Sequence, residues 1–127
     1  MTGYPDPNKY EWDFEKRGSI GIWYMNGWKG FADEDLEAAS EHYRERGSER
    51  DITATIAVFG DEANLGKETQ EYMGREWSKN GEYTGVDKIG FVSEGLVAMA
   101  VCSNMDISTA KVEHFDRLDD AIEWIKS

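Results

Sequence analysis

The sequence predicts an α/β fold with a mixed, mostly parallel sheet, an N-terminal antiparallel hairpin and about four helices. Residues 52–59 are a charge-free run of apolar and β-branched residues that ends at Gly60, as expected for a central strand buried on both faces. Helical patterns alternate with short apolar runs in the rest of the chain, which favours helices packed on parallel strands. Near the start, two strand patterns flank a short turn, which indicates a hairpin.

The hairpin is predicted from a strict alternation that begins at Tyr10. Tyr10, Trp12 and Phe14 share one face and acidic residues occupy the other, which is typical of a half-buried edge strand. Residues 17–19 form the turn, and residues 20–25 return as the second strand. Because the first strand is a sheet edge that a second copy could extend, both a monomer and a homodimer stay open.

The length of 127 residues suits one domain with a single core. Residues 1–8 contain both prolines and little to bury, so we expect a flexible N-terminal tail followed by a single domain over residues 9–127. No apolar run approaches the ~20 residues that a membrane span needs, and no leader-peptide pattern is present. We therefore expect a cytoplasmic protein without stable membrane insertion.

An aromatic loop follows the hairpin at residues 26–31, where Trp28 and Phe31 stand beside two glycines. In one interpretation the two rings fold onto the core or staple the next helix. In the other they form an exposed contact surface. The next helix is predicted over residues 33–46, and His42, among polar neighbours, is interpreted as a surface histidine.

After the central strand, a second helix is expected to run to about Lys79 and to end at Asn80-Gly81. Residues 86–92 then predict a further strand. The core-facing positions of this helix are expected to be Leu65, Thr69, Tyr72, Met73 and Trp77.

The segment 96–102 suits either a strand or a buried helix, and we interpret it as a short helix that Ser93 caps. Residues 111–115 predict the last strand, and Asp116 is expected to cap the final helix. The apolar stripe of that helix consists of Leu118, Ala121, Ile122 and Ile125.

The chain is strongly acidic, with 26 Asp and Glu against 14 Lys and Arg and a net charge of −12. This balance opposes nucleic-acid phosphates and anionic membranes, so we expect no nucleic-acid partner. The acidic residues are dispersed, as in proteins of a salt-rich cytoplasm, and we expect a halophilic archaeon as the source. The alternatives are an ordinary acidic surface and, more rarely, mimicry of nucleic acid.

Catalytic and metal-binding patterns are weak. Residues 60–66 occupy a strand-loop-helix position but lack the Lys and the glycine spacing of a phosphate-binding loop. His42 and His114 have no metal-ligand spacing, and Cys102 lies in an apolar segment without an activated-thiol motif. We therefore predict a protein that is not an enzyme and needs neither cofactor nor metal. If there is a site, we expect it at the carboxyl ends of the strands, near residues 61–65 and 93–96.

Several segments resemble the SpoIIAA-like branch of the STAS superfamily. Residues 88–94 resemble that branch's strand and following turn. Residues 111–125 resemble its closing pattern, a strand that ends in Phe followed by an acidic helix with Ala and a late Trp. Residues 26–36 are similar to its glycine, lysine and acidic helix start, and the order of elements agrees over about residues 10–126.

The resemblance implies a non-enzymatic interaction or regulatory module that contacts a partner protein through the loop and helix from Asp61 to Trp77. In anti-anti-sigma members, a serine at the start of that helix is phosphorylated. Residues 60–64 contain no Ser or Thr here, so a phosphoswitch is not expected. The alternative is a carrier or sensor of a small apolar, lipid-like ligand. The predicted partner-binding residues are Trp28, Phe31, Asp61, Glu62, Asn64 and Lys67.

Overall fold

The computed structural model describes residues 12–25, 34–60 and 66–127 and has the predicted α/β architecture. Five strands form one sheet in the order β1-β2-β3-β4-β5, with β1 antiparallel to β2 and the other neighbours parallel. The elements are β1 (Asp13–Arg17), β2 (Ile20–Met25), α1 (Glu34–Gly47), β3 (Ala54–Phe59), α2 (Lys67–Thr84), β4 (Lys88–Val92), α3 (Val97–Ser103), β5 (Lys111–Phe115) and α4 (Leu118–Lys126).

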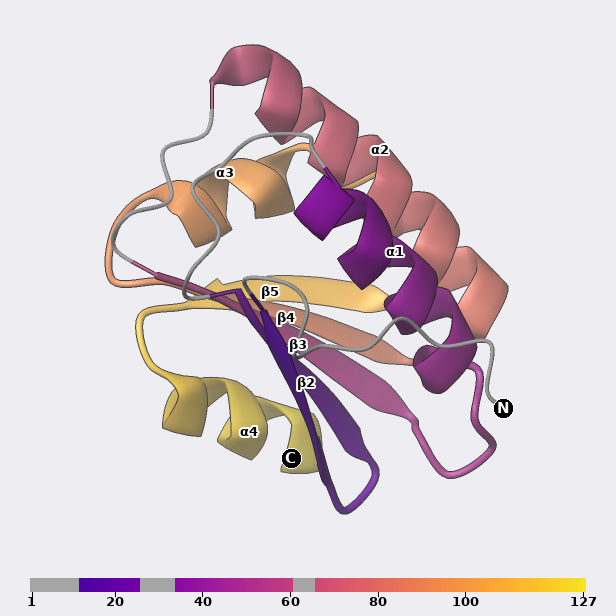
Figure 1. Ribbon diagram of the computed structural model, residues 1–127. Coiled ribbons are helices and arrows are strands. Elements are labelled where there is room, and N and C mark those ends of the chain that lie inside the picture. The colour runs from indigo at the N-terminus through magenta and orange to yellow at the C-terminus, as the bar shows by residue number, and fades with distance from the viewer. Residues whose placement is uncertain (1–11, 26–33, 61–65) are drawn as a thin grey trace.

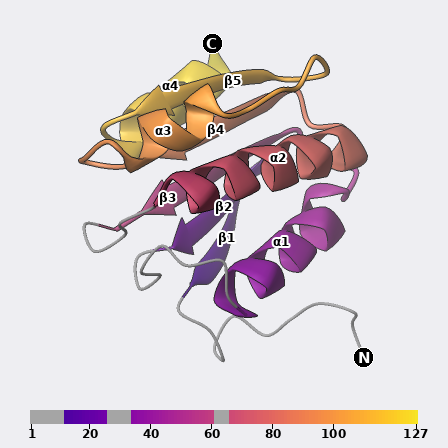
Figure 2. The same ribbon diagram turned by 90° about the horizontal axis from the view of Figure 1, so that it is seen from above.

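The helices divide unequally between the two faces of the sheet. Figure 1 shows α1, α2 and α3 together on one face and α4 alone on the other, and Figure 2 views the sheet from the side of the first three. The strand order explains this, because each crossover from β2 to β5 moves one strand in the same direction. Crossovers of one hand then place every connecting helix on the same face. The last helix, α4, follows the final strand and is free to cover the other face.

The hairpin is confirmed, with β1 at the edge of the sheet. Its turn contains Gly18 at a φ of +63°, a left-handed conformation that glycine adopts without steric cost. Trp12, just before β1, is buried, as the alternation predicts for its face. Tyr10, the first member of the predicted pattern, lies outside the described residues.

The central strand is also confirmed, because β3 is the third of five strands and five of its six residues are buried. It separates two apolar clusters. One lies under α1, α2 and α3 and is rich in aromatic rings. The other lies under α4, and its buried members are Ile20, Ile22, Ile56, Val92, Ala121 and Ile122.

The ambiguous segment is a helix, α3, as interpreted. The N-cap position is occupied by Leu96 and not by Ser93, but the Ser93 Oγ still accepts a hydrogen bond of 3.0 Å from the backbone N–H of Ala98 in the first turn. In α4 the predicted stripe packs against the sheet. The expected cap by Asp116 is wrong, because Arg117 occupies the N-cap position and makes no side-chain capping bond.

The predicted end of the second helix is also wrong. The helix α2 passes through Asn80 and Gly81 and ends at Thr84, followed by Gly85 at a φ of +75°. Tertiary packing explains the difference, because Asn80 is 1% exposed and a Cβ at Gly81 would lie 2.7 Å from the side chains of Ile89 and Ile107. Both residues lie within the helix, where they allow close packing against neighbouring elements, and they do not terminate it.

Candidate interaction surface

The parallel strands β2 to β5 end at one edge of the sheet, which we call the carboxyl edge. The helix α2 starts at this edge after β3, and α3 starts there after β4. Of the predicted partner-binding residues, Lys67 is exposed as the first residue of α2. The others, Trp28, Phe31, Asp61, Glu62 and Asn64, lie outside the described residues.

The N-cap residue and first turn of α3 expose apolar side chains, within and just after the segment 93–96 where the sequence analysis placed a possible site. Leu96 is 72% exposed and Met99 is 42% exposed, three positions apart and therefore on the same side of the helix. Ala98 and Val101, on the other side, are buried. The apolar run of residues 96–102 concealed this difference, although the helical period within it was the signal that could have revealed it.

The loop before α3 is fixed by Ser93, which is 4% exposed. Its hydroxyl donates a hydrogen bond of 3.0 Å to the Gly95 carbonyl oxygen and also accepts the bond from Ala98. Both partners belong to the same turn, so the hydroxyl orders the segment that carries Leu96. We assign Ser93 a structural role in holding the exposed turn in place.

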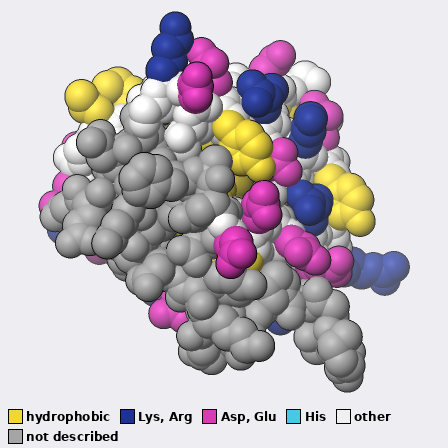
Figure 3. Space-filling view, turned by 45° about the horizontal axis from the view of Figure 1, so that its top comes forward, with side chains coloured by type: hydrophobic (Ala, Val, Ile, Leu, Met, Phe, Trp, Pro, Cys, Tyr) yellow, Lys and Arg dark blue, Asp and Glu magenta, His cyan; other side chains and the backbone are white. Residues whose placement is uncertain are grey.

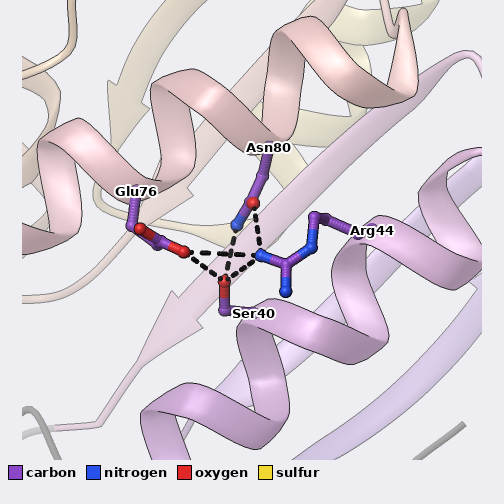
Figure 4. A network of polar contacts seen from close by, with 4 residues as sticks. All are labelled: Ser40, Arg44, Glu76 and Asn80. Atoms are coloured by element: carbon purple, nitrogen blue, oxygen red, sulfur yellow. Dashed lines mark hydrogen bonds and ion pairs between the residues drawn. The ribbon is translucent and has the colours of Figure 1, made fainter.

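A polar network joins the two long helices (Figure 4). Ser40 and Arg44, one turn apart on α1, face Glu76 and Asn80, one turn apart on α2. The Ser40 hydroxyl accepts bonds from Arg44 Nη1 at 3.1 Å and from Asn80 Nδ2 at 2.9 Å, and it donates to Glu76 Oε1 at 3.3 Å. Arg44 Nη1 also bonds to Asn80 Oδ1 at 3.0 Å.

This network combines a buried part with a half-exposed part. Ser40 and Asn80 are nearly inaccessible, and the Arg44–Glu76 ion pair, at 3.4 Å, lies where both side chains still reach water. Because the serine hydroxyl uses its donor and two acceptor positions, the helices are held in one relative register. The spacing of four residues on each helix is visible in the sequence, whereas their pairing across helices depends on the tertiary fold.

His42 is buried, so its interpretation as a surface histidine is wrong. Its Nδ1 accepts a hydrogen bond of 3.0 Å from Trp23 Nε1, and the rings of Trp12 and Phe14 lie 5.1 and 4.9 Å away. Burial, followed by the positive charge of Arg46, lowers the pKa of His42 to about 4. The imidazole is therefore neutral near pH 7, with its proton on Nε2.

Tyr43, beside His42, packs in the same layer and hydrogen-bonds Thr55 on the central strand. Its ring stacks on Trp23 at a centroid distance of 4.8 Å, and burial raises the pKa of its hydroxyl. These buried polar groups position the helix α1 on the sheet. The Trp23–His42 and Tyr43–Thr55 hydrogen bonds pair these polar groups inside the core.

Cys102 is half-buried on α3, and burial together with the Glu113 carboxylate raises the pKa of its thiol. That direction disfavours the thiolate that a nucleophilic cysteine requires. Within residues 12–25, 34–60 and 66–127, no three His, Cys, Asp or Glu side chains gather as a metal site would require. Within the same part of the chain, no helix combines the length and apolarity of a membrane span.

Comparisons with protein-family models, with curated proteins and with solved structures found no match to this chain.

Proposed function

We propose that this chain is a non-enzymatic, STAS-like protein-interaction or regulatory module. The observation that carries the proposal is the exposed apolar turn at the start of α3, where Leu96 and Met99 project at the carboxyl edge. Exposed apolar side chains that share one side of a helix are typical of contact surfaces. A partner that covers both would remove their surface from water, which is favourable at about 25 cal/mol for each Å².

The location of this turn supports the same proposal. In open α/β sheets, ligands and partners bind outside the carboxyl ends of the strands. Lys67, at the start of α2, and Leu96, before α3, follow neighbouring strands and so belong to that edge. The rigid support from Ser93 beneath the turn reduces the entropy that binding would cost.

Photo-crosslinking would test this surface. A benzoyl-phenylalanine replaces Leu96 in one variant and Tyr83 in the other, and each is incubated with extract of the source cells. Tyr83 is a matched control because it is 69% exposed but lies at the opposite end of α2. We expect a discrete crosslinked partner from position 96 and none from position 83. Equal crosslinking from both positions, or none from either, would contradict the proposed surface.

We also propose that the acidic surface is an adaptation to a salt-rich cytoplasm. Every Asp and Glu whose burial the structure describes is at least partly exposed, so salt can screen their mutual repulsion. The free energy of unfolding should then rise steadily from low to molar potassium chloride. A value that stays flat or falls over that range would oppose this adaptation.

A further inference from the structure

An open groove lies along the first half of α2, toward the carboxyl edge. It has a volume of about 410 Å³ and is lined by Glu68, Thr69, Glu71, Tyr72 and Arg75. Figure 3 views the molecule from the side of the helical layer and shows carboxylate and cationic side chains around apolar ones on the part that is not grey. We propose that this groove receives a basic segment of the partner protein, with an arginine or lysine side chain over Tyr72. The proposal rests on the proposed function for the identity of the partner as a protein.

The charge around the groove favours a cation. Two carboxylates, Glu68 and Glu71, line it against the single guanidinium of Arg75. Burial, then the charges of Glu76 and Glu37, raise the pKa of the Tyr72 phenol, and the charges of Arg44 and Arg75 oppose this shift. At low salt the net charge of −12 also attracts basic segments and repels acidic ones.

The residues that line the groove favour a long side chain with a charged end. Tyr72 is half-buried, so it offers a phenol ring as an apolar wall that the methylene stem of arginine or lysine can contact. A guanidinium that lies over the ring gains a cation–π contact, and the carboxylates beside it can accept its hydrogen bonds. Both interactions occur together only for a basic side chain.

Contacts with α1 hold the part of α2 that forms the groove. Glu76, one turn after Tyr72, is held by Ser40 and Arg44 of α1, so this part of α2 keeps a fixed position relative to α1. Arg44 is occupied by Glu76, Ser40 and Asn80 and does not compete for the groove carboxylates within the described contacts. Binding therefore requires little reordering of this face.

The test titrates the full chain at low salt with a peptide of alternating arginine and alanine whose two ends are chemically blocked. Backbone amide NMR shifts of the protein report the binding. The control peptide carries citrulline, a neutral analogue, at each arginine position. We expect shifts that concentrate on Thr69, Tyr72 and Arg75, and none with the citrulline peptide. Shifts that spread over all acidic surfaces, or equal binding of the two peptides, would overturn the inference.

Two pairs of variants separate the groove from general attraction. Glu68→Gln with Glu71→Gln should weaken binding roughly three- to tenfold, whereas Glu82→Gln with Glu123→Gln removes the same charge elsewhere and should change it by less than about twofold. Tyr72→Ala should weaken binding and Tyr72→Phe should retain it. Equal weakening by both glutamine pairs, or no effect of Tyr72→Ala, would contradict a specific groove.

The two proposals fail differently. Crosslinking at Leu96 without binding of the arginine peptide would overturn the inference and leave the interaction module standing. Peptide binding in the groove without any crosslinked partner would support the groove and contradict the proposed surface at α3.

Discussion

The two faces of the sheet achieve burial in different ways. Under α1, α2 and α3 the core contains large aromatic rings linked by buried hydrogen bonds, such as Trp23 to His42. Under α4 the buried residues are aliphatic or small and pack against one apolar stripe, and the hydrogen bonds from Lys88 to the end of α4 are only partly buried. Directional contacts specify one arrangement of the helices, whereas an aliphatic stripe tolerates small adjustments. A surface on the first face can therefore keep a defined shape for a partner.

The largest expected effect comes from truncating one large side chain on each face. Trp23→Ala should lower the free energy of unfolding by about 3–5 kcal/mol, because it opens a cavity and leaves His42 Nδ1 without its donor. Ile122→Ala, under α4, should cost about 2 kcal/mol. Urea unfolding followed by circular dichroism measures both, and equal losses would contradict the difference between the faces.

The second prediction concerns the stability of the fold at acidic pH. The pKa of His42 is about 4 in the folded chain and about 6.5 when unfolded, so the unfolded state binds more protons between these values. Stability should therefore be fully present above about pH 6.5 and fall by about 3 kcal/mol as the pH drops toward 4. His42→Gln should remove this dependence of the free energy of unfolding on pH. His114→Gln, at an exposed position, is the control, and loss of the dependence in it instead would refute the assignment.

The third prediction uses one glycine on each face. A Cβ at Gly74 of α2 would lie 2.5 Å from the Asn104 carbonyl oxygen, whereas one at Gly90 of β4 would meet Ile56 at 3.6 Å, under α4. Gly74→Ala should therefore destabilise by about 1–3 kcal/mol, and Gly90→Ala should be neutral or slightly stabilising. Thermal unfolding of both variants measures the two changes in stability. A larger loss in Gly90→Ala than in Gly74→Ala would contradict the prediction.

The smallest effect concerns how α4 is held. Lys88 Nζ donates hydrogen bonds to the carbonyl oxygens of Trp124 at 2.9 Å and Ile125 at 3.4 Å and lies 5.3 Å from the Trp124 ring centroid. Lys88→Met, which keeps the apolar stem, should lower stability by about 0.3–1 kcal/mol through the loss of this helix-terminal cation. Lys111→Met removes the same charge at an exposed position and should leave stability almost unchanged. A similar loss in both variants would mean that only net charge matters.

The sequence predicted the secondary-structure elements more successfully than the tertiary contacts between them. The pattern of residues 52–59 identified the central strand, and the stripe of Ala121 and Ile122 identified the last helix, because burial imposes a period on the chain. Asn80 and Gly81 were interpreted by local propensity as a helix end, whereas contacts from distant residues extend the helix past them. His42 had polar neighbours in sequence but aromatic ones in space.

The candidate surface was predictable only in part. Its position at the carboxyl edge followed from the strand pattern. The exposure of Leu96 and the groove at Tyr72 depend on how α2 and α3 lie on the sheet, which no local pattern encodes. The predicted residues in the two loops remain predictions.

The central claim is that the layer between the sheet and α1 to α3 is a packed core and that function resides on the surface above it. Trp23, Tyr43, Trp77 and Phe91 are each at most 1% exposed within this layer. Native mass spectrometry of protein purified at high salt, before and after denaturation, tests the claim most directly. We expect the mass of the bare chain, or a multiple of it, in both spectra. An apolar molecule released only on denaturation would contradict it and favour the carrier of a lipid-like ligand.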